Sequence, residues 1–238
     1  MSSSRSARVR RAPSASLDRG ALERELAAGL AQLHLELPDA AIGKLLDYLA
    51  LLSKWNAVYN LTAVRDPGAM LVQHLFDCLA VLPPLRSGPD RLAAGAVVLD
   101  VGSGGGLPGV VLAVCAPGAQ VHCVDTVGKK AAFITQVRAE LQLPNLHAHH
   151  ARVEDLRAGR ELPAATLIVS RAFSSLAQFV SLTAHLLAPG GAWAAMKGQW
   201  PEDEIAALPA GVRLGATFTL QVPRLDARRH LLMIEPAA

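Results

Sequence analysis

The 238-residue sequence has few aromatic residues, few cysteines and no long apolar run. Aromatic residues make up 4% of the chain, which argues against a surface built mainly for stacking unpaired bases. No uninterrupted apolar run approaches the length that spans a bilayer, so we expect a soluble protein without a membrane segment. The three cysteines, Cys78, Cys115 and Cys123, form no Cys-x-x-Cys pair. We therefore expect reduced core thiols and a cytoplasmic location.

Metal-binding patterns are also scarce. His147 and His149 fall on one face of an expected strand, but no thiol or carboxylate stands beside them. A two-histidine metal site is the alternative to solvent-facing or core histidines, and we favour the histidines without a metal.

The overall composition is that of a folded, mildly basic protein. Hydrophobic residues make up 51% of the chain, the formal net charge is +3 and the isoelectric point is about 9.0. This length and composition predict one large α/β domain with an appendage. The charge permits a polyanionic partner but does not require one.

The most informative segment, residues 97–109, reads Val-Val-Leu-Asp-Val-Gly-Ser-Gly-Gly-Gly-Leu-Pro-Gly. An apolar β-branched run that breaks into glycines predicts a buried parallel strand followed by a tight loop. Gly102 and Gly104 let the backbone turn sharply and approach a ligand closely. The helix expected near Pro108 turns its free N–H groups toward the loop. This arrangement predicts a site for a nucleotide-like cofactor rather than an empty turn.

Two acidic residues narrow the choice of cofactor. Asp100 precedes the first glycine and would repel a pyrophosphate, whereas it can accept a hydrogen bond from an amine. Leu107 stands where the nicotinamide fingerprint requires its third glycine. Asp125 ends a second expected strand about 20 residues past the loop, where an acid holds ribose hydroxyls. The Asp-x-Gly-x-Gly pattern resembles class I S-adenosylmethionine-dependent methyltransferases, which implies S-adenosyl-L-methionine as the cofactor.

Three regions are expected along the chain. Residues 1–20 are rich in serine and arginine and predict a disordered basic extension, with a transit peptide and a phosphate-binding arm as alternatives. Residues 21–95 predict three helices packed on the sheet near the cofactor. The third helix begins at Asp66-Pro67, buries Met70, Leu71, Leu75 and Leu79, and ends at Pro83-Pro84. Residues 96–238 predict the class I methyltransferase core.

Strands and helices alternate from Ala96 onward, which predicts a Rossmann-like, doubly wound α/β sheet. A helix over 176–187 is expected to stop at Pro189-Gly190-Gly191. Seven strands are expected, near residues 97–101, 121–125, 146–150, 166–170, 192–197, 212–222 and 230–235.

The residues after the fourth expected strand bear on the methyl acceptor. Ser170-Arg171-Ala172-Phe173 lacks the Asn/Asp-Pro-Pro-aromatic pattern of amino-group methyltransferases, and no cysteine lies nearby for attack on a cytosine ring. Exocyclic amines and carbon atoms are therefore disfavoured as acceptors. Guanine N7 fits, because its in-plane lone pair carries no proton and needs alignment rather than a base.

Several longer motifs resemble one family closely. They are Lys54-Trp55-Asn56, residues 60–67 (Asn-Leu-Thr-Ala-Val-Arg-Asp-Pro), His74-Leu75-Phe76-Asp77, residues 169–173, Met196-Lys197-Gly198 and Arg229-His230-Leu231. Together with the glycine loop they resemble the bacterial ribosomal small-subunit methyltransferase G family, also called glucose-inhibited division protein B, from about Lys44 to Glu235. The resemblance implies methylation of N7 of one guanine in 16S ribosomal RNA.

The resemblance also implies site residues. It assigns cofactor contacts to Gly102, Leu107, Val153, Glu154 and Arg171. The predicted cofactor-binding set adds Asp100, Ser103, Gly104 and Asp125, and Arg171, Lys197 and Asn60 are candidates for positioning the acceptor. Candidate RNA-backbone contacts, most of them expected to be ordinary solvated charges, are Lys129, Lys130, Arg138, Arg152, Arg157, Arg224, Arg228 and Arg229.

Some alternatives stay open. Asn60 either contacts RNA or cofactor or ends a helix, whereas for Asp66 we favour the helix cap. Asp77 either pairs with His74 or faces the target base. The expected partner is 16S ribosomal RNA or the small subunit, bound by a monomer without metal or membrane. The rival functions are a small-molecule or protein methyltransferase, a non-catalytic cofactor-sensing RNA-binding protein, and a nicotinamide dehydrogenase.

Overall fold

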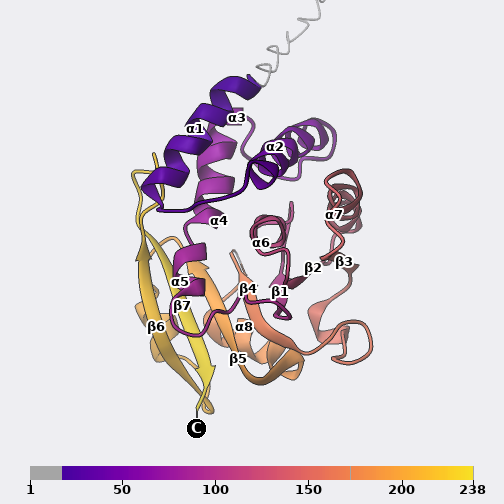
Figure 1. The fold of residues 1–238 in the computed structure, drawn as a ribbon. Helices are drawn as coiled ribbons and strands as arrows, with labels where there is room; N and C mark the ends of the chain where they lie inside the picture. Colours follow the sequence, from indigo (N-terminus) through magenta and orange to yellow (C-terminus); the bar gives the residue numbers. More distant parts are fainter. Residues whose placement is uncertain (1–17, 172, 238) are drawn as a thin grey trace, which may run out of the picture.

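The computed structural model describes residues 18–171 and 173–237 (Figure 1). Residues 1–17 of the expected basic extension lie outside the described residues. Helix α1 (Arg19–Gln32) begins at Arg19, within the last two residues of the expected extension. The Asp18 carboxylate accepts a hydrogen bond from the Ala21 N–H at 3.0 Å, which satisfies a free donor at the start of this helix.

A seven-stranded sheet forms the centre of the molecule, which confirms the predicted doubly wound class I methyltransferase fold. Its order is β3-β2-β1-β4-β5-β7-β6, with the first five strands along the chain parallel and β7 antiparallel to both of its neighbours. The strands are β1 (Val97–Val101), β2 (Gln120–Asp125), β3 (Leu146–His150), β4 (Ala165–Ser170), β5 (Leu187–Lys197), β6 (Val212–Leu220) and β7 (Arg229–Pro236).

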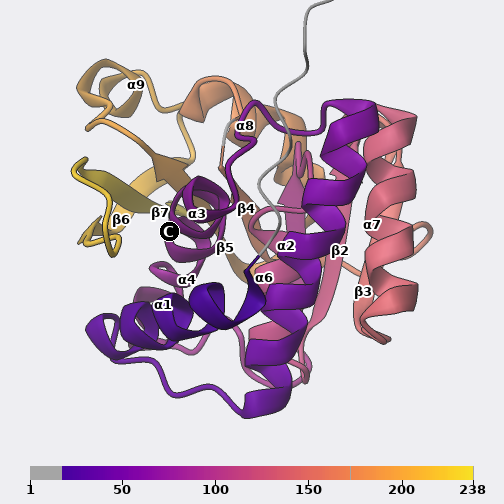
Figure 2. The same cartoon turned by 90° about the horizontal axis from the view of Figure 1, so that it is seen from above.

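Helices cover both faces of the sheet (Figure 2). On one face lie α6 (Gly109–Cys115) and α7 (Gly128–Glu140), with α2 (Asp39–Tyr59) packed over them, and on the other lies α8 (Leu176–Thr183). Strand β1 shows why two cores form. Val98 points into the core on the α6 side, whereas Leu99 and Val101 join the core on the α8 side, because alternate strand residues face opposite ways.

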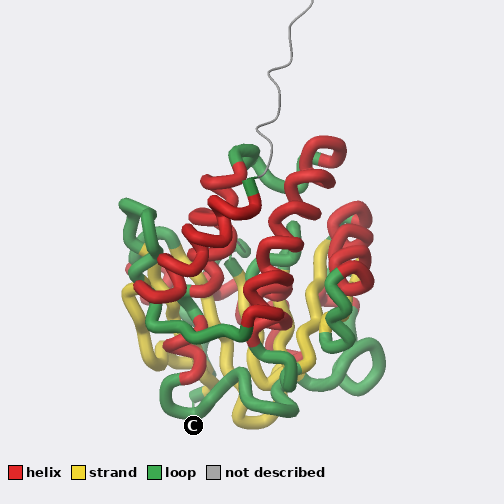
Figure 3. Tube along the Cα trace, turned by 45° about the horizontal axis from the view of Figure 1, so that its top comes forward, coloured by secondary structure: helices red, strands yellow, loops and turns green. Residues whose placement is uncertain are grey.

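The helical segment before the sheet continues from α1 and α2 into α3 (Pro67–Met70), the π-helix η1 (Leu71–Phe76), α4 (Asp77–Leu79) and α5 (Leu82–Arg86). In Figure 3 these helices stand in front of the strands. The predicted cap is confirmed, since the Asp66 carboxylate accepts from the Ala69 N–H at 2.8 Å. The predicted end at Pro83-Pro84 is wrong. Both prolines lie in the first turn of α5, where a missing N–H costs no helical hydrogen bond.

One helical stretch of the described chain, which comprises α3, η1, α4 and α5, has the length and composition of a membrane span. It runs over Pro67–Arg86, with 20 residues and a mean hydropathy of 1.4. The stretch is not an uninterrupted apolar run, because Gln73, His74 and Asp77 lie within it. Of its apolar window, 72% is buried, with Met70, Leu71, Leu75 and Leu79 all at most 1% exposed. Burial in the protein core accounts for its composition.

Two details of the second half also differ from expectation. Strand β5 begins at Leu187, so Pro189-Gly190-Gly191 lies inside it rather than in a loop, and α8 ends at Thr183 followed by the 3₁₀ turn η3 (Ala184–Leu186). The β4–β5 register shifts between Ala165 and Leu167, an irregularity that accommodates the left-handed Gly190. The short helix α9 (Glu202–Ala206) follows β5.

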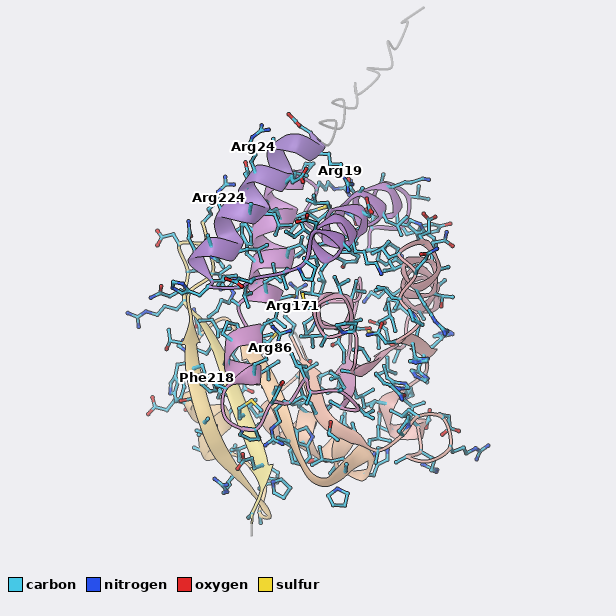
Figure 4. All side chains as sticks on the ribbon, in the orientation of Figure 1. Arg19, Arg24, Arg86, Arg171, Phe218 and Arg224 are labelled. Carbon is cyan, nitrogen blue, oxygen red and sulfur yellow. The ribbon has the colours of Figure 1, made fainter. Side chains whose placement is uncertain are left out.

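The connection between β6 and β7 reaches back to the first helix. Arg224, in this connection, forms an ion pair with Glu25 of α1 across 199 positions of sequence. Figure 4 labels Arg224 beside α1. The contact ties the helical segment to the antiparallel side of the sheet. The three cysteines are free and buried, as predicted.

Candidate active site

The glycine loop between β1 and α6 is held by backbone hydrogen bonds to the next strand. The N–H groups of Gly102 and Ser103 donate to the Val124 carbonyl at 3.0 and 3.2 Å. Gly102 and Gly104 have φ values of +68° and +59°, in the left-handed region that side chains disfavour. The loop shape therefore depends on glycine at these two positions.

Asp100 lies beneath the loop and is fully buried. Its Oδ2 accepts a hydrogen bond from the Gly109 N–H at 2.8 Å, at the start of α6. Its Oδ1 has no partner among the described residues. Burial raises the pKa of this carboxyl to about 7, and the bond from Gly109 opposes the shift. An unpartnered buried oxygen is costly, so a ligand donor that reached it would be stabilised.

Asp125, at the end of β2, joins the loop to the beginning of α7. Its Oδ2 accepts from the Gly104 N–H at 3.0 Å and its Oδ1 from the Val127 N–H at 2.9 Å. Lys130 Nζ lies 3.4 Å from Oδ2. Lys130, a candidate RNA contact, is thus engaged with the carboxylate that holds the glycine loop.

Tyr48 is a residue of this site that sequence reasoning missed. Its hydroxyl donates to the Gly105 carbonyl at 2.7 Å, and its side chain is fully buried in α2. Burial raises the pKa of this phenol well above its usual value, so the donor stays protonated. No local pattern marks it, because the contact spans 57 positions. Helix α2 thereby fixes the middle of the glycine loop.

The backbone at Gly104 borders open space. A Cβ built at Gly104 would meet no atom closer than 4.0 Å, whereas one at Gly102 would lie 3.3 Å from the Phe173 ring. Open space at Gly104, the unpartnered Asp100 oxygen and the Asp125 carboxylate lie together at one edge of the sheet. This set suits a ligand that carries an amine and a ribose but no phosphate.

The other predicted cofactor residues lie nearby with their own contacts. The Ser103 hydroxyl donates to the Val124 carbonyl at 3.4 Å, and Leu107 is buried. Val153 is buried in the 3₁₀ turn η2 (Val153–Asp155) after β3, in the core on the α8 side. Glu154 forms an ion pair with Arg152 at 2.9 Å. Their cofactor contacts stay predictions.

A cavity of about 340 Å³ lies beyond β4, β5 and β7. Asp77 is clamped in its wall between two arginines. Arg229 Nε lies 3.1 Å from Asp77 Oδ1, and Arg171 Nη1 lies 3.5 Å from Oδ2 and donates to the Gln73 carbonyl at 3.0 Å. Figure 4 labels Arg171 in the middle of the molecule, between the helical segment and the sheet. The lining residues are Gln73, His74, Asp77, Arg171, Met196, Lys197, Gly198, Leu220, Arg229 and His230.

The alternative pairing of His74 with Asp77 does not form. The His74 Nε2 atom is instead 2.9 Å from the Thr62 hydroxyl. Burial, with a smaller contribution from Arg171, lowers the His74 pKa to about 4. His74 is therefore neutral near pH 7, and Asp77 is the anionic group of the cavity.

Two further candidates have structural partners. Lys197 Nζ lies 2.7 Å from Glu204 Oε2 and donates to the Ser174 carbonyl at 3.3 Å. Asn60 ends α2 in the left-handed conformation, and its Oδ1 accepts from Arg65 at 2.9 Å. The structure favours the helix-end interpretation for Asn60.

The candidate RNA contacts divide into paired and unpaired cations. Arg152, Arg224 and Arg229 each face a carboxylate, and Lys129 donates to the Tyr59 carbonyl at 2.9 Å. Within the described residues no ion pair is formed by Arg138, Arg157 or Arg228.

His147 and His149 lie on one face of β3, as predicted, and both rings stack on His122 of β2. The ring centroids lie 4.6 and 5.2 Å from that of His122. In the part of the chain that the structure describes, no group of three or more histidine, cysteine or acidic residues has a geometry that could hold a metal ion.

A family model described as rRNA small subunit methyltransferase G matches residues 41–232. The chain belongs to this family. Among curated relatives, the protein named ribosomal RNA small subunit methyltransferase G from Burkholderia vietnamiensis is 55% identical over 227 residues, which cover 95% of this chain and 96% of the relative. The protein of the same name from Burkholderia ambifaria is 56% identical over the same shares.

Solved structures support the fold. TrmN from Thermus thermophilus superposes with a TM-score of 0.53 at 20% identity, over 67% of this chain and 48% of that chain. A SAM-dependent methyltransferase from Aquifex aeolicus superposes with a TM-score of 0.52 at 19% identity, over 71% of this chain and 93% of that chain. These matches agree with the class I architecture of the methyltransferase G family.

Proposed function

We propose that this protein transfers the methyl group of S-adenosyl-L-methionine to N7 of one guanine in 16S ribosomal RNA. The observation that carries the proposal is the placement of the glycine loop and the basic cavity at the same carboxyl edge of the sheet. In parallel α/β sheets, ligands bind at this edge. The relatives named for ribosomal RNA methylation supply the class of acceptor.

The cofactor side is proposed to be held mainly by the loop and the two acids. The backbone at Gly102, Ser103 and Gly104 leaves room for the ligand, and Asp100 and Asp125 attract its amine and its ribose. Bound S-adenosyl-L-methionine supplies an electrophilic methyl group on a sulfonium. Leu107, Val153 and Glu154 are proposed to line the remainder of the cofactor site, and Arg171 to lie where cofactor and acceptor meet.

The acceptor side is proposed to be the cavity around Asp77. Its volume of about 340 Å³ is at the lower end of the usual range for ligand pockets. The N7 lone pair forms the new bond to carbon, the carbon–sulfur bond breaks with its electrons left on sulfur, and no proton moves. The guanine ring gains positive charge, and we propose that the Asp77 carboxylate, which also pairs with Arg171 and Arg229, offsets part of it.

Arg171 and Lys197 are proposed to position the RNA rather than to transfer protons. A guanidinium can donate to the guanine O6 or to a phosphate, which leaves N7 free for attack. Asn60 is proposed to act indirectly, by ending α2 beside the motif that follows. The enzyme is proposed to act as a monomer in the cytoplasm, where ribosomal RNA is assembled into subunits.

Methyl transfer to purified small ribosomal subunits tests the proposal. With labelled cofactor, we expect label in 16S RNA and 7-methylguanosine at one position by mass spectrometry. Label in protein or in a small molecule, but not in RNA, would favour the rival enzyme classes. RNA binding without any label transfer would instead support the non-catalytic cofactor-sensing protein. An increase in melting temperature with NAD but not with S-adenosylhomocysteine would support a dehydrogenase.

A further inference from the structure

Trp200 is a large apolar side chain that the fold leaves at the surface. It is 46% exposed, whereas Trp193 is 2% exposed. It follows β5 directly and contacts the ring of the buried His230, with centroids 5.7 Å apart and planes inclined at 74°. The two rings are therefore not stacked face to face.

The surface around Trp200 adjoins the acceptor cavity. A second cavity of about 630 Å³ is lined by Gly198, Gln199, Trp200, Arg228, Arg229 and His230, with Ala227 completing it. Gly198, Arg229 and His230 line both cavities. If a nucleotide filled the acceptor cavity, the neighbouring nucleotide of the same strand would thus lie close to Trp200.

The charge of this surface favours an anionic partner. Arg228 is exposed and, within the described residues, forms no ion pair, while Arg229 faces Asp77. Glu204 accepts from Lys197 and from the Leu176 N–H at 2.7 Å, so it is directed into the fold. The exposed acids Glu202, Asp203 and Asp226 lie close in sequence, but none of them lines either cavity.

We propose that Trp200 stacks on an unpaired RNA base adjacent to the target guanine, with Arg228 contacting the phosphate beside it. The inference rests on the proposed function, because it takes RNA as the acceptor. Every base has a π-face, so an exposed aromatic ring beside a cation suits single-stranded RNA of varied sequence. An apolar protein partner would gain nothing from Arg228, which forms no ion pair among the described residues.

The test uses the full chain with two substitutions of the same residue. Trp200→Leu keeps an apolar side chain over His230 but removes the ring, and Trp200→Phe keeps a ring. With a short single-stranded RNA containing guanine, we expect Trp200→Leu to bind roughly 10-fold more weakly and Trp200→Phe within about 3-fold of the parent. Binding of S-adenosylhomocysteine should be unchanged in both. Equal RNA affinity for the parent and Trp200→Leu would overturn the inference.

Two further readouts separate stacking from a merely structural role. A stacked base should quench the fluorescence of Trp200, so quenching by single-stranded RNA should be present in the parent and lost in Trp200→Phe. Quenching that persists in Trp200→Phe would contradict the inference. Arg228→Ala should lower affinity and reduce the salt dependence by about one phosphate contact. An unchanged salt dependence would remove Arg228 from the proposed contact.

Failure of this inference is distinguishable from failure of the proposed function, because RNA binding is measured without methyl transfer. If the parent methylates 16S RNA and Trp200→Leu binds RNA and methylates it equally well, the stacking role is wrong and the function stands. If the parent binds RNA through Trp200 but transfers no methyl group to it, the proposed methyl transfer is wrong and the proposed RNA contact at Trp200 is supported.

Discussion

The two halves of the site are built in different ways. The glycine loop is shaped mainly by backbone hydrogen bonds to β2, with Asp100 and Asp125 around it and the Tyr48 hydroxyl bound to its middle. The acceptor cavity is shaped by side chains from the helical segment, β4, β5 and β7, with Arg171, Lys197 and Arg229 in its wall. We expect the carboxylates of the loop half to favour a cationic cofactor and the arginines of the cavity half to favour an anionic RNA.

The largest effect is expected from Gly104→Val, which should damage only the loop half. Valine at φ +59° is strained and fills space that is open beside Gly104. We expect S-adenosylhomocysteine to bind more than about 100-fold more weakly, a loss of about 2.7 kcal/mol. Calorimetry measures the affinity, and circular dichroism checks the fold. Normal cofactor affinity would show that the loop is not the cofactor site.

Arg171→Ala is expected to act where the two halves meet. Removal of the guanidinium takes away one partner of Asp77 and the bond to the Gln73 carbonyl. We expect kcat/KM for RNA methylation to fall at least about 100-fold. Stability should fall by less than transition-state stabilisation does, because Asp77 keeps Arg229 as a partner. Denaturant unfolding measures the second quantity, and equal losses in the two free energies would make Arg171 a structural residue.

Tyr48→Phe should produce a smaller effect, confined to the loop half. The substitution removes one hydrogen bond to the Gly105 carbonyl and leaves the ring packed in α2. We expect a loss of about 1 kcal/mol in stability and a change of up to about fivefold in cofactor affinity. RNA affinity, measured on the same preparation, should stay at the parent value. A tenfold loss in RNA affinity with unchanged cofactor affinity would show that α2 supports the acceptor cavity rather than the glycine loop.

The smallest effect near neutral pH is expected at the histidine cluster, which lies outside both halves. Burial, with contributions from His147 and His149, lowers the His122 pKa to about 4. The folded state keeps this ring neutral, while the unfolded chain binds a proton below its ordinary pKa of about 6.5. Stability should therefore fall as the pH drops from about 6.5 to 4.

His122→Phe tests this assignment, because it removes the titrating ring from the centre of the cluster. Thermal unfolding of the variant should depend less steeply on pH over that range than unfolding of the parent. Cofactor affinity at pH 7 should be unchanged. Identical pH profiles for the two proteins would assign the acid sensitivity to other groups, of which the buried His74 is the first candidate.

The difference between the halves also explains what the sequence could predict. Strand β1, the loop and Asp125 follow from local patterns, and the Asp66 cap does as well, since each depends on neighbouring residues. The Asp77 clamp joins Arg229 across 152 positions and the Tyr48 contact spans 57, so no local pattern marks either. Local rules predict breaks at the prolines of α5 and the glycines of β5. The prolines instead lie in the first turn of α5, and the glycines lie at the irregularity of β5, where the fold tolerates them.

The place of β7 between β5 and β6 has a consequence for how the protein is made. Synthesis runs from the amino end, so β6 leaves the ribosome before β7, with which it pairs. Helix α1 likewise precedes its ion-pair partner Arg224 by 199 positions. The antiparallel side of the sheet therefore cannot close until β7 has been synthesised. An enzyme of a ribosome-modifying family thus completes its fold only after most of its chain has emerged from a ribosome.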